Sequence, residues 1–343
     1  MRAPKSWIAE LVDLPKSISD QEIADALVRV GFEVEEVITQ GADLKGPLVV
    51  GKVLAIEELK EHKKPIRYVE LDCAEGQSRF VICGAQNFKV GDLVVVSLPG
   101  AELPGGFAIS ARETYGKTSN GMICSSRELG LGDDHSGIIV LPEGMPGQDA
   151  FELLQIADTI FDIAVNPDRG YALSIRGIAR EIAASLGLSY RDPAKIKIDF
   201  KDSGTPVNAK ISDGADVMYL RTLQGFDPKA PSPMWMRRRL EKCGMRSISL
   251  AVDITNYVML ELGQPLHAFD ADKIDGFLEI RRANSSKKLK TLDGVDRELN
   301  PDDLVVADSK SVLALAGTMG GADSEISDKT TRIAVEAVHF DAI

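Results

Sequence analysis

Polar side chains interrupt an otherwise apolar stretch between residues 252 and 270, and they are the first candidates for chemistry in this chain. They are Thr255, Asn256, Gln264, His267 and Asp270. Burying a polar group is unfavourable unless it is hydrogen-bonded. In one interpretation Asn256 and His267 only cap the local backbone at a turn. In the other, these side chains line a cleft.

A glycine-rich turn and an isolated carboxylate form the second candidate group. Gly317, Gly320 and Gly321 follow a short apolar run, and glycine lets backbone N–H groups approach a ligand closely. Glu336 lies within Ala334–Val338, an otherwise apolar stretch that predicts a buried strand. Taken alone, the glycines are typical of a tight turn, and such a carboxylate is more often solvent-facing or salt-bridged than functional.

A basic cluster stands on the helix predicted over residues 234–243. Its members are Arg237, Arg238, Arg239 and Lys242, with Arg246 beyond the end of the helix. Such a cluster can face phosphates, but arginine is also common on solvated helix surfaces. Because the apolar residues of the same helix must supply its core side, we expect the basic residues to lie on a solvated face.

Several standard signatures of catalysis are absent from the sequence. It has no Walker A loop, no Rossmann glycine fingerprint and no His-Glu-x-x-His motif. The four cysteines form no C-x-x-C pair, and in a chain of this length we expect them to be reduced and buried. The residues therefore predict no metal or nucleotide site of a common type.

Composition narrows the class of protein. The chain has 343 residues, of which 44% are hydrophobic, and its 40 Lys and Arg against 52 Asp and Glu give a net charge of −12. This balance argues against non-specific nucleic-acid binding through a basic surface, although a local basic site is compatible with it. No apolar signal segment and no 18-residue apolar run occur. We expect a cytoplasmic protein that does not contact a membrane.

The pattern of helices and strands predicts an α+β multidomain protein. The first forty residues favour two helices and a strand, with a capping box at Ser19–Glu22 and a helix stop at Gly31. A strand at 160–165 and a helix at 173–187 resume this signal later. We therefore predict a split N-terminal α+β domain, formed by residues 1–40 and 155–195, with another domain inserted into it.

The inserted domain, residues 41–154, is rich in short β runs. They are predicted at 49–56, 68–71, 80–83, 93–98 and 138–141, with a helical piece at 125–129. Five short strands suit a small OB-fold barrel. After a linker at 192–208, a third α+β domain is predicted over 205–343. Its strands lie at 217–223, 277–281, 304–307, 312–316 and 333–338, and its helices at 234–243, opened by an N-cap at Ser232, and 254–262.

Several strings together resemble one family, the beta subunits of bacterial phenylalanine–tRNA ligase. Those of the N-terminal and inserted domains are Ser6–Ile8, Val12–Pro15, Gly31–Glu35, Val81–Asn87, Leu98–Ala101, Gly130–Gly137, Asn166–Arg169 and Leu173–Glu181. The segments Val252–Asp270 and Gly317–Gly321 resemble the editing domain of that subunit. The first barrel hairpin departs from the family pattern: it reads His62-Lys63-Lys64-Pro65-Ile66-Arg67 in place of His-Pro-Asn-Ala-Asp-Lys-Leu.

The resemblance implies a fold and an activity. The inserted barrel would be a tRNA-binding-type OB-fold domain, and the third domain a B3/B4-type editing domain, incomplete at its C-terminus because the family's subunit is much longer. The complete enzyme would charge tRNA with phenylalanine using ATP and Mg, as a heterotetramer of two alpha and two beta subunits with synthesis in the alpha subunit. This fragment would bind neither cofactor and would not aminoacylate alone.

Residue roles follow from the same resemblance. Glu336 would accept a hydrogen bond from the hydroxyl of a mischarged tyrosine, and the backbone of Gly317 would form that end of the pocket. His267, with Thr255 and Asn256, would line the polar wall near the amino and ester groups. Two other functions remain open: a non-catalytic RNA-binding or assembly module, and a free-standing deacylase.

Overall fold

The computed structural model describes residues 1–59, 65–132, 136–199 and 205–341. The chain divides into two compact units. The first comprises Met1–Asn166, Glu181–Ser189 and Arg237–Arg246, and the second comprises Pro167–Arg180, Tyr190–Met236 and Ser247–Ile343. In the described part of the chain, no helix is long and apolar enough to cross a membrane.

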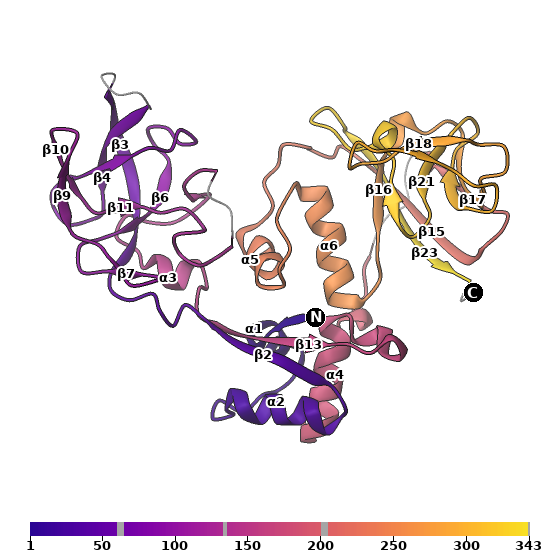
Figure 1. The fold of residues 1–343 in the computed structure, drawn as a ribbon, viewed down its shortest axis with the longest axis horizontal. Coiled ribbons are helices and arrows are strands. Elements are labelled where there is room, and N and C mark those ends of the chain that lie inside the picture. The colour runs from indigo at the N-terminus through magenta and orange to yellow at the C-terminus, as the bar shows by residue number, and fades with distance from the viewer. Residues whose placement is uncertain (60–64, 133–135, 200–204, 342–343) are drawn as a thin grey trace. The chain divides into compact units, whose positions relative to one another are not determined.

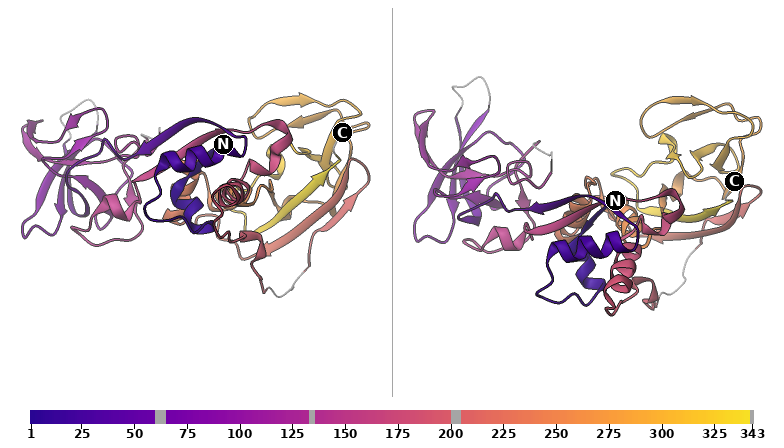
Figure 2. Two further views of the ribbon diagram at one scale, coloured as in Figure 1. Left: turned by 90° about the horizontal axis from the view of Figure 1, so that it is seen from below. Right: turned by 60° about the horizontal axis from the view of Figure 1, so that its bottom comes forward.

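A three-stranded antiparallel sheet forms the N-terminal part of the first unit, in the order β1-β13-β2. Its elements, with the helices beside it, are β1 (Arg2–Pro4), α1 (Lys5–Leu11), α2 (Asp20–Arg29), β2 (Glu33–Gln40), β13 (Asp158–Ala164) and α4 (Ile175–Leu186). Strand β13 places Ile160 opposite both Pro4 and Ile38. Helix α2 and the end of α4 lie on the same side of this sheet (Figures 1 and 2). The beginning of the chain and β13 thus share one sheet, as expected of a split N-terminal α+β domain, whereas the bounds 1–40 and 155–195 stay a prediction.

Local signals set the bounds of α2 as expected. The hydroxyl of Ser19 accepts a hydrogen bond from the backbone N–H of Glu22, and the Glu22 carboxylate accepts one from the N–H of Ser19. At the other end Gly31 adopts a φ of 85°, a conformation that glycine reaches without steric cost. Ile23 and Leu27, one turn apart, are fully buried against the rest of the domain.

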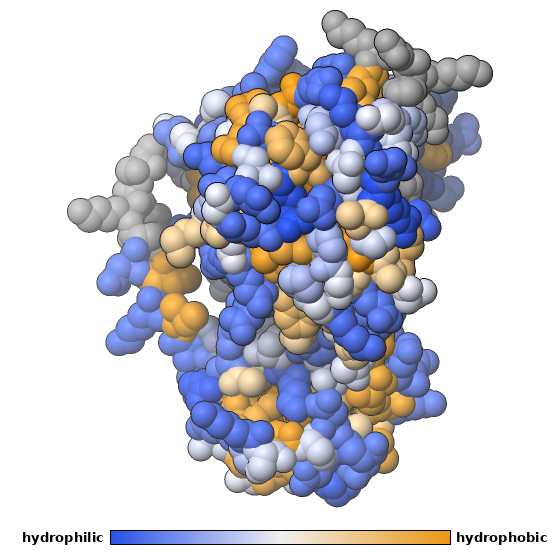
Figure 3. Space-filling view, turned by 90° about the vertical axis from the view of Figure 1, so that its left-hand side faces the viewer, coloured by the Kyte–Doolittle hydropathy of each residue, from blue (hydrophilic) through white to orange (hydrophobic). Residues whose placement is uncertain are grey.

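The inserted domain is an open-edged β-barrel of the OB-like type, with strand order β11-β6-β3-β4-β5 and β12 also paired with β6. The elements are β3 (Leu48–Leu59), β4 (Ile66–Asp72), β5 (Arg79–Cys83), β6 (Leu93–Ser97), β7 (Glu102–Leu103), β8 (Phe107–Ala108), β9 (Ala111–Thr114), β10 (Lys117–Asn120), β11 (Met122–Ile123), β12 (Val140–Leu141) and α3 (Ala150–Leu153). Val69, Leu71, Val81, Val94 and Val96 fill its core. The face seen in Figure 3 is mainly hydrophilic with small apolar patches.

The helical piece expected at 125–129 is wrong: the chain forms turns there, in which the hydroxyl and N–H of Ser125 both donate to the Glu128 carboxylate. This capping pair satisfies a single turn without propagating a helix, because Gly130 follows two residues later with a φ of 67°. Much of the unusual first hairpin, His62 to Lys64, and Asp133 to His135 of the resemblance, lie outside the described residues.

The basic cluster lies on helix α5 (Met234–Lys242), where the sequence predicted a solvated face. Arg238 and Lys242 are only 5% and 6% exposed. Arg238 is paired with Glu241, and the Lys242 Nζ lies 2.7 Å from Asp158 Oδ2. Arg239 is paired with Glu10. The predicted solvated face is thus wrong for this cluster, because carboxylates of the first unit neutralise it and allow burial.

Ser232, which the sequence suggested as the N-cap of this helix, has a different partner. Helix α5 begins at Met234, two residues later, and the Ser232 hydroxyl donates to Asp253 Oδ2. Asp253 is fully buried and also accepts hydrogen bonds from the Ser247 hydroxyl and the Ile248 N–H. These bonds hold the start of helix α6 (Leu250–Leu262) against both preceding loops.

The second unit contains two sheets that pack face to face. One has the order β14-β17-β20-β21-β22, with β14 parallel to β17, and the other is the antiparallel sheet β15-β23-β16. The strands are β14 (Asn208–Ile211), β15 (Ala215–Gln224), β16 (His267–Asp270), β17 (Phe277–Arg282), β18 (Lys288–Lys290), β19 (Asp296–Glu298), β20 (Leu304–Ala307), β21 (Val312–Leu315), β22 (Met319–Gly320) and β23 (Arg332–Phe340). Short 3-10 helices lie at η1 (Pro167–Ala172), η2 (Pro193–Lys195), η3 (Ala271–Lys273) and η4 (Ala322–Ser324).

The core of the second unit joins the two sheets. Phe269 and Ala334 come from one sheet, Leu278, Ile280 and Val306 from the other, and all five are buried in one apolar cluster. Figure 1 shows β16 and β23 next to the strands of the other sheet. The core therefore lies between the sheets, so any polar side chain that points inward from β16 or β23 is desolvated.

Candidate functional site

His267 and Glu336 lie directly opposite each other on the neighbouring antiparallel strands β16 and β23. Directly opposed residues of an antiparallel pair project to the same face of the sheet. On β23, Ala334 and Val338 lie two residues before and after Glu336, so they share its face, and both pack into the core between the sheets. The carboxyl group of Glu336 and the imidazole of His267 are therefore on the inner face.

Burial changes the protonation of Glu336. The residue is 8% exposed, and Leu220 of β15 lies opposite it on its other side. Burial raises the pKa of its carboxyl to about 7, because the anion is poorly solvated there. The buried Oε2 atom has no hydrogen-bond partner among the described residues. A buried carboxyl oxygen without a partner is able to accept a hydrogen bond from a ligand.

His267 occupies the second polar position on this face. Its ring makes an edge contact with Phe269, with centroids 4.5 Å apart. Burial lowers the pKa of its imidazole, so the neutral ring is favoured at pH 7. A neutral imidazole carries one donor and one acceptor nitrogen. The pair on this face therefore combines a histidine that can position a polar group with a carboxyl that can be protonated or ionised near pH 7.

The glycine turn between β21 and β22 closes this face. A Cβ atom on Gly320 would lie 2.6 Å from His267 Cε1, so only a residue without a side chain fits beside the ring. Gly317 has a φ of 64°, and a Cβ there would lie 3.2 Å from the Phe340 ring. Phe340 shares the inner face of β23 with Glu336, and the turn thus covers the same face as the His267–Glu336 pair.

Thr255 and Asn256 belong to α6, and no hydrogen bond in the described residues joins them to His267 or Glu336. The Thr255 hydroxyl donates to the carbonyl of Val252 in its own helix, a common use of threonine within helices. After α6, the Gln264 side chain donates to the Val338 carbonyl of β23. The structure thus groups His267, Glu336 and the glycine turn, whereas Thr255 and Asn256 lie on α6, the helix that precedes β16 in the chain.

Leu220 was not singled out from the sequence, and Gly320 was named only as a member of the glycine run. Leu220 has no chemical signature, and only the strand register shows that it lies beside Glu336. Gly320 was visible as part of the glycine run, but its contact with His267 depends on the packing of the turn. Asp270 serves a different purpose: it accepts a hydrogen bond from the Thr330 hydroxyl at the end of β16.

Within the described ranges, no group of three or more His, Cys, Asp or Glu could hold a metal ion. A hollow of about 440 Å³ lies in the first unit and is lined by Lys5, Ser6, Gln40 and Asp158, among others. None of its lining residues is a candidate from the sequence. The His267–Glu336 face remains the strongest site for chemistry.

Comparisons with known proteins agree with the sequence resemblance. The family model "Putative tRNA binding domain" matches residues 48–149, and the model "B3/4 domain" matches residues 214–343. The His267–Glu336 face lies within the second match.

Curated relatives match the whole chain. Phenylalanine–tRNA ligase beta subunits from Thermobifida fusca and Streptomyces avermitilis are each 56% identical over 100% of this chain, and that of Nocardia farcinica is 48% identical. The chain covers 42% of each of these relatives. A solved N-terminal fragment of the Pyrococcus horikoshii phenylalanyl-tRNA synthetase beta-subunit aligns at 14% identity, with a TM-score of 0.32, over 54% of this chain and 57% of that chain.

Proposed function

Because the chain belongs to the phenylalanine–tRNA ligase beta subunit family, we propose that its second unit removes tyrosine that has been attached by mistake to tRNA. The observation that carries this proposal is the buried, unpartnered carboxyl of Glu336 opposite His267. A synthetic site that binds phenylalanine discriminates poorly against tyrosine, which only adds a hydroxyl. A second site that hydrogen-bonds this hydroxyl supplies the missing selectivity.

Glu336 is the residue that recognises the tyrosine hydroxyl. Its ionised carboxyl accepts the hydrogen bond of the tyrosine O–H, and phenylalanine leaves that carboxyl without a partner in an apolar setting. Leaving a buried charged group unpaired is unfavourable, so phenylalanyl-tRNA binds this site less well. The backbone of Gly317 forms the same end of the pocket.

Hydrolysis takes place at the other end of the amino acid. An oxygen nucleophile, water or water assisted by a ribose hydroxyl, attacks the carbonyl carbon of the ester, and the bond to the ribose oxygen breaks as that oxygen takes up a proton. His267 positions the ester and the water, and Thr255 and Asn256 contribute to the polar wall near the amino group.

The remainder of the enzyme is proposed on the same basis. The chain spans about two fifths of the curated relatives that it matches. Synthesis of phenylalanyl-tRNA, with its ATP and Mg, is assigned to the alpha subunit of a heterotetramer of two alpha and two beta subunits. The domains are residues 1–40 with 155–195, residues 41–154, and the editing domain 205–343. The tRNA is a partner of the whole assembly.

The test compares Glu336→Ala with wild type in the complete beta subunit, assembled with alpha. Loss of a charge-assisted hydrogen bond of about 1.5–3 kcal/mol should slow hydrolysis of tyrosyl-tRNA by about 10- to 150-fold. Attachment of phenylalanine should be nearly unchanged. Glu325→Ala removes an exposed carboxylate of the same unit and serves as the control. Unchanged hydrolysis in Glu336→Ala, with folding intact, would remove Glu336 from the site and favour a non-catalytic role for this unit.

A further inference from the structure

The outer face of the barrel carries two carboxylate–aromatic pairs in register. Glu57 of β3 lies opposite Tyr68 of β4, and Glu70 of β4 lies opposite Phe80 of β5. On β4, Val69 and Leu71 point into the barrel core, so the alternate residues Tyr68 and Glu70 face outward. The Tyr68 and Phe80 rings are stacked with centroids 5.3 Å apart, which makes the two pairs one continuous surface.

The first pair already holds a cation from the same chain. The Lys117 Nζ lies 3.0 Å from Glu57 Oε2 and 4.9 Å from the centre of the Tyr68 ring. A carboxylate and an aromatic face attract an ammonium group together, the one through charge and the other through its quadrupole. This arrangement shows which chemistry the surface accepts.

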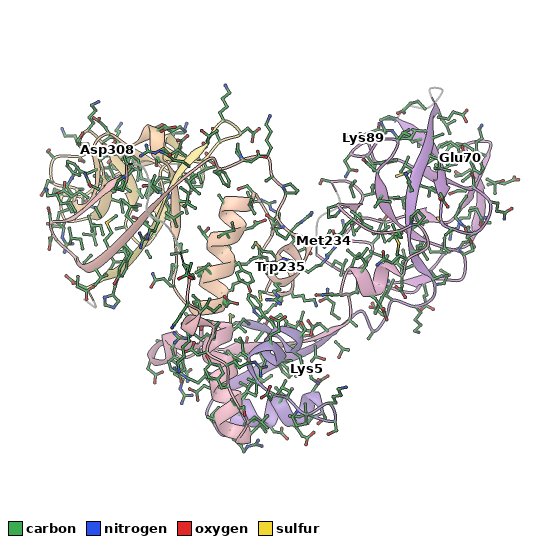
Figure 4. The ribbon with its side chains drawn as sticks, turned by 180° about the vertical axis from the view of Figure 1, so that it is seen from behind. Lys5, Glu70, Lys89, Met234, Trp235 and Asp308 are labelled. Atoms are coloured by element: carbon green, nitrogen blue, oxygen red, sulfur yellow. The ribbon has the colours of Figure 1, made fainter. Side chains whose placement is uncertain are left out.

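The second pair, Glu70 and Phe80, also combines a carboxylate with an aromatic ring, but among the described residues no Lys or Arg is paired with it. Glu70 has Ala55 opposite it on β3 and accepts a hydrogen bond of 2.6 Å from the Ser78 hydroxyl, which leaves its negative charge unbalanced. Phe80 is 38% exposed. Figure 4 labels Glu70 on the barrel, among the side chains at its surface. The open pair therefore lies beside an occupied one of the same chemistry.

The net charge of the whole domain favours one kind of partner over another. Residues 48–149 include ten Lys and Arg against fourteen Asp and Glu, a net charge of −4. Phosphate backbones are attracted by positive charge, and an acidic face repels them. A basic side chain on a protein is attracted by the same face.

We propose that the Glu70–Phe80 pair binds an arginine side chain of a protein partner. The guanidinium would lie against the Phe80 ring and pair with the Glu70 carboxylate, as Lys117 does with Tyr68 and Glu57. Arginine fits better than lysine, because its planar guanidinium can stack on the ring and donate to both carboxylate oxygens. This binding surface is independent of tyrosine removal by the second unit.

The probe is the peptide acetyl-Gly-Arg-Gly-amide, titrated into the isotopically labelled 343-residue chain and followed by NMR. Saturable shifts of the amide signals of residues 70 and 80 are expected. The same peptide with citrulline, which has arginine's shape without its charge, should cause no saturable shift. Glu70→Gln and Phe80→Leu should each weaken binding by about 3- to 10-fold, the usual effect of an exposed ion pair or cation–π contact.

The control variant is Glu143→Gln, which removes one exposed carboxylate elsewhere in the domain. Three results would overturn the proposal. The first is a loss of affinity in Glu143→Gln as large as in Glu70→Gln, which would indicate only general attraction to an acidic chain. The second is that the citrulline peptide binds as well as the arginine peptide, or that the arginine peptide does not bind at all. The third is saturable binding of a single-stranded RNA oligonucleotide that Phe80→Leu abolishes, which would assign the face to RNA.

Discussion

Asp158 and Lys242 form an ion pair from which water is almost excluded. The Nζ–Oδ2 distance is 2.7 Å, and the side chains are 3% and 4% exposed, respectively. Asp158 also accepts hydrogen bonds from the backbone N–H and the hydroxyl of Ser6. One carboxylate at the start of β13 thereby joins α1, β13 and α5. Buried pairs of this kind contribute less to net stability than to a single arrangement of the elements they connect.

Removing one partner of this pair should be strongly destabilising. In Lys242→Met the Asp158 carboxylate stays buried and loses its counter-charge, which costs about 3–5 kcal/mol. The midpoint of urea unfolding of the first unit should fall accordingly. Arg246→Met, a change at an exposed basic residue of the same segment, should change the free energy of unfolding by less than about 0.5 kcal/mol. Equal effects of the two variants would contradict a special role for the pair.

The same helix shows what the sequence could not predict. The basic run of α5 was visible, but its burial depends on partners far away in the chain. Lys242 and Asp158 are separated by 84 residues, and Arg239 and Glu10 by 229. Local patterns carry no information about such pairs, so a solvated face was the natural expectation. In contrast, the capping box at Ser19 and the stop at Gly31 act within one turn of helix, and both were predicted correctly.

In the candidate site, too, local features could be predicted from the sequence, whereas contacts between distant segments could not. The strand around Glu336 and the glycine turn could be predicted, because alternation and glycine runs are local signals. The register that places His267 opposite Glu336, and Leu220 on the other side, is a tertiary property. A shift of one residue in this pairing would turn every side chain of the strand to the opposite face, so the site exists only in the observed register.

Asp253 should be essential for the folding of the second unit. It is fully buried and accepts hydrogen bonds from Ser232, Ser247 and Ile248. In Asp253→Ala these three donors lose their acceptor, and the Ser232 hydroxyl among them is buried, so we expect a loss of about 2–4 kcal/mol in the free energy of unfolding. Chemical unfolding measures it. Ser232→Ala removes only one bond and should cost about 1 kcal/mol. A smaller loss in Asp253→Ala than in Ser232→Ala would contradict this account.

Gly320→Ala should damage the site while leaving the rest of the protein intact. The new methyl group would overlap His267 Cε1 at 2.6 Å and approach Leu292 Cδ1 at 3.0 Å, so the imidazole must move. A displacement of this size is expected to slow tyrosyl-tRNA hydrolysis in the complete enzyme by about 10²-fold. The control is Gly84→Ala, since a Cβ there meets no atom within 4 Å. Normal hydrolysis by Gly320→Ala would show that the position of His267 is not needed.

Glu336 should make the stability of the chain fall as the pH rises. Burial raises the pKa of its carboxyl from 4.5 to about 7. Between these values the folded protein holds a proton that the unfolded chain has already released. The free energy of unfolding therefore decreases as the pH increases through this range, and the contribution is fully present only below pH 4.5. The difference in pKa corresponds to on the order of 3 kcal/mol.

Glu336→Gln tests this directly, because glutamine has nearly the same shape and cannot ionise. The variant should unfold at higher urea concentration than wild type at pH 8, and at about the same concentration at pH 4. In the complete enzyme the same substitution should weaken the hydrolysis of tyrosyl-tRNA, since a neutral amide accepts a weaker hydrogen bond than a carboxylate. Stability and activity would thus change in opposite directions at one residue. A stability difference that does not vary with pH would show that the carboxyl is solvated in the folded protein, and that it cannot be the buried acceptor that selection of tyrosine requires.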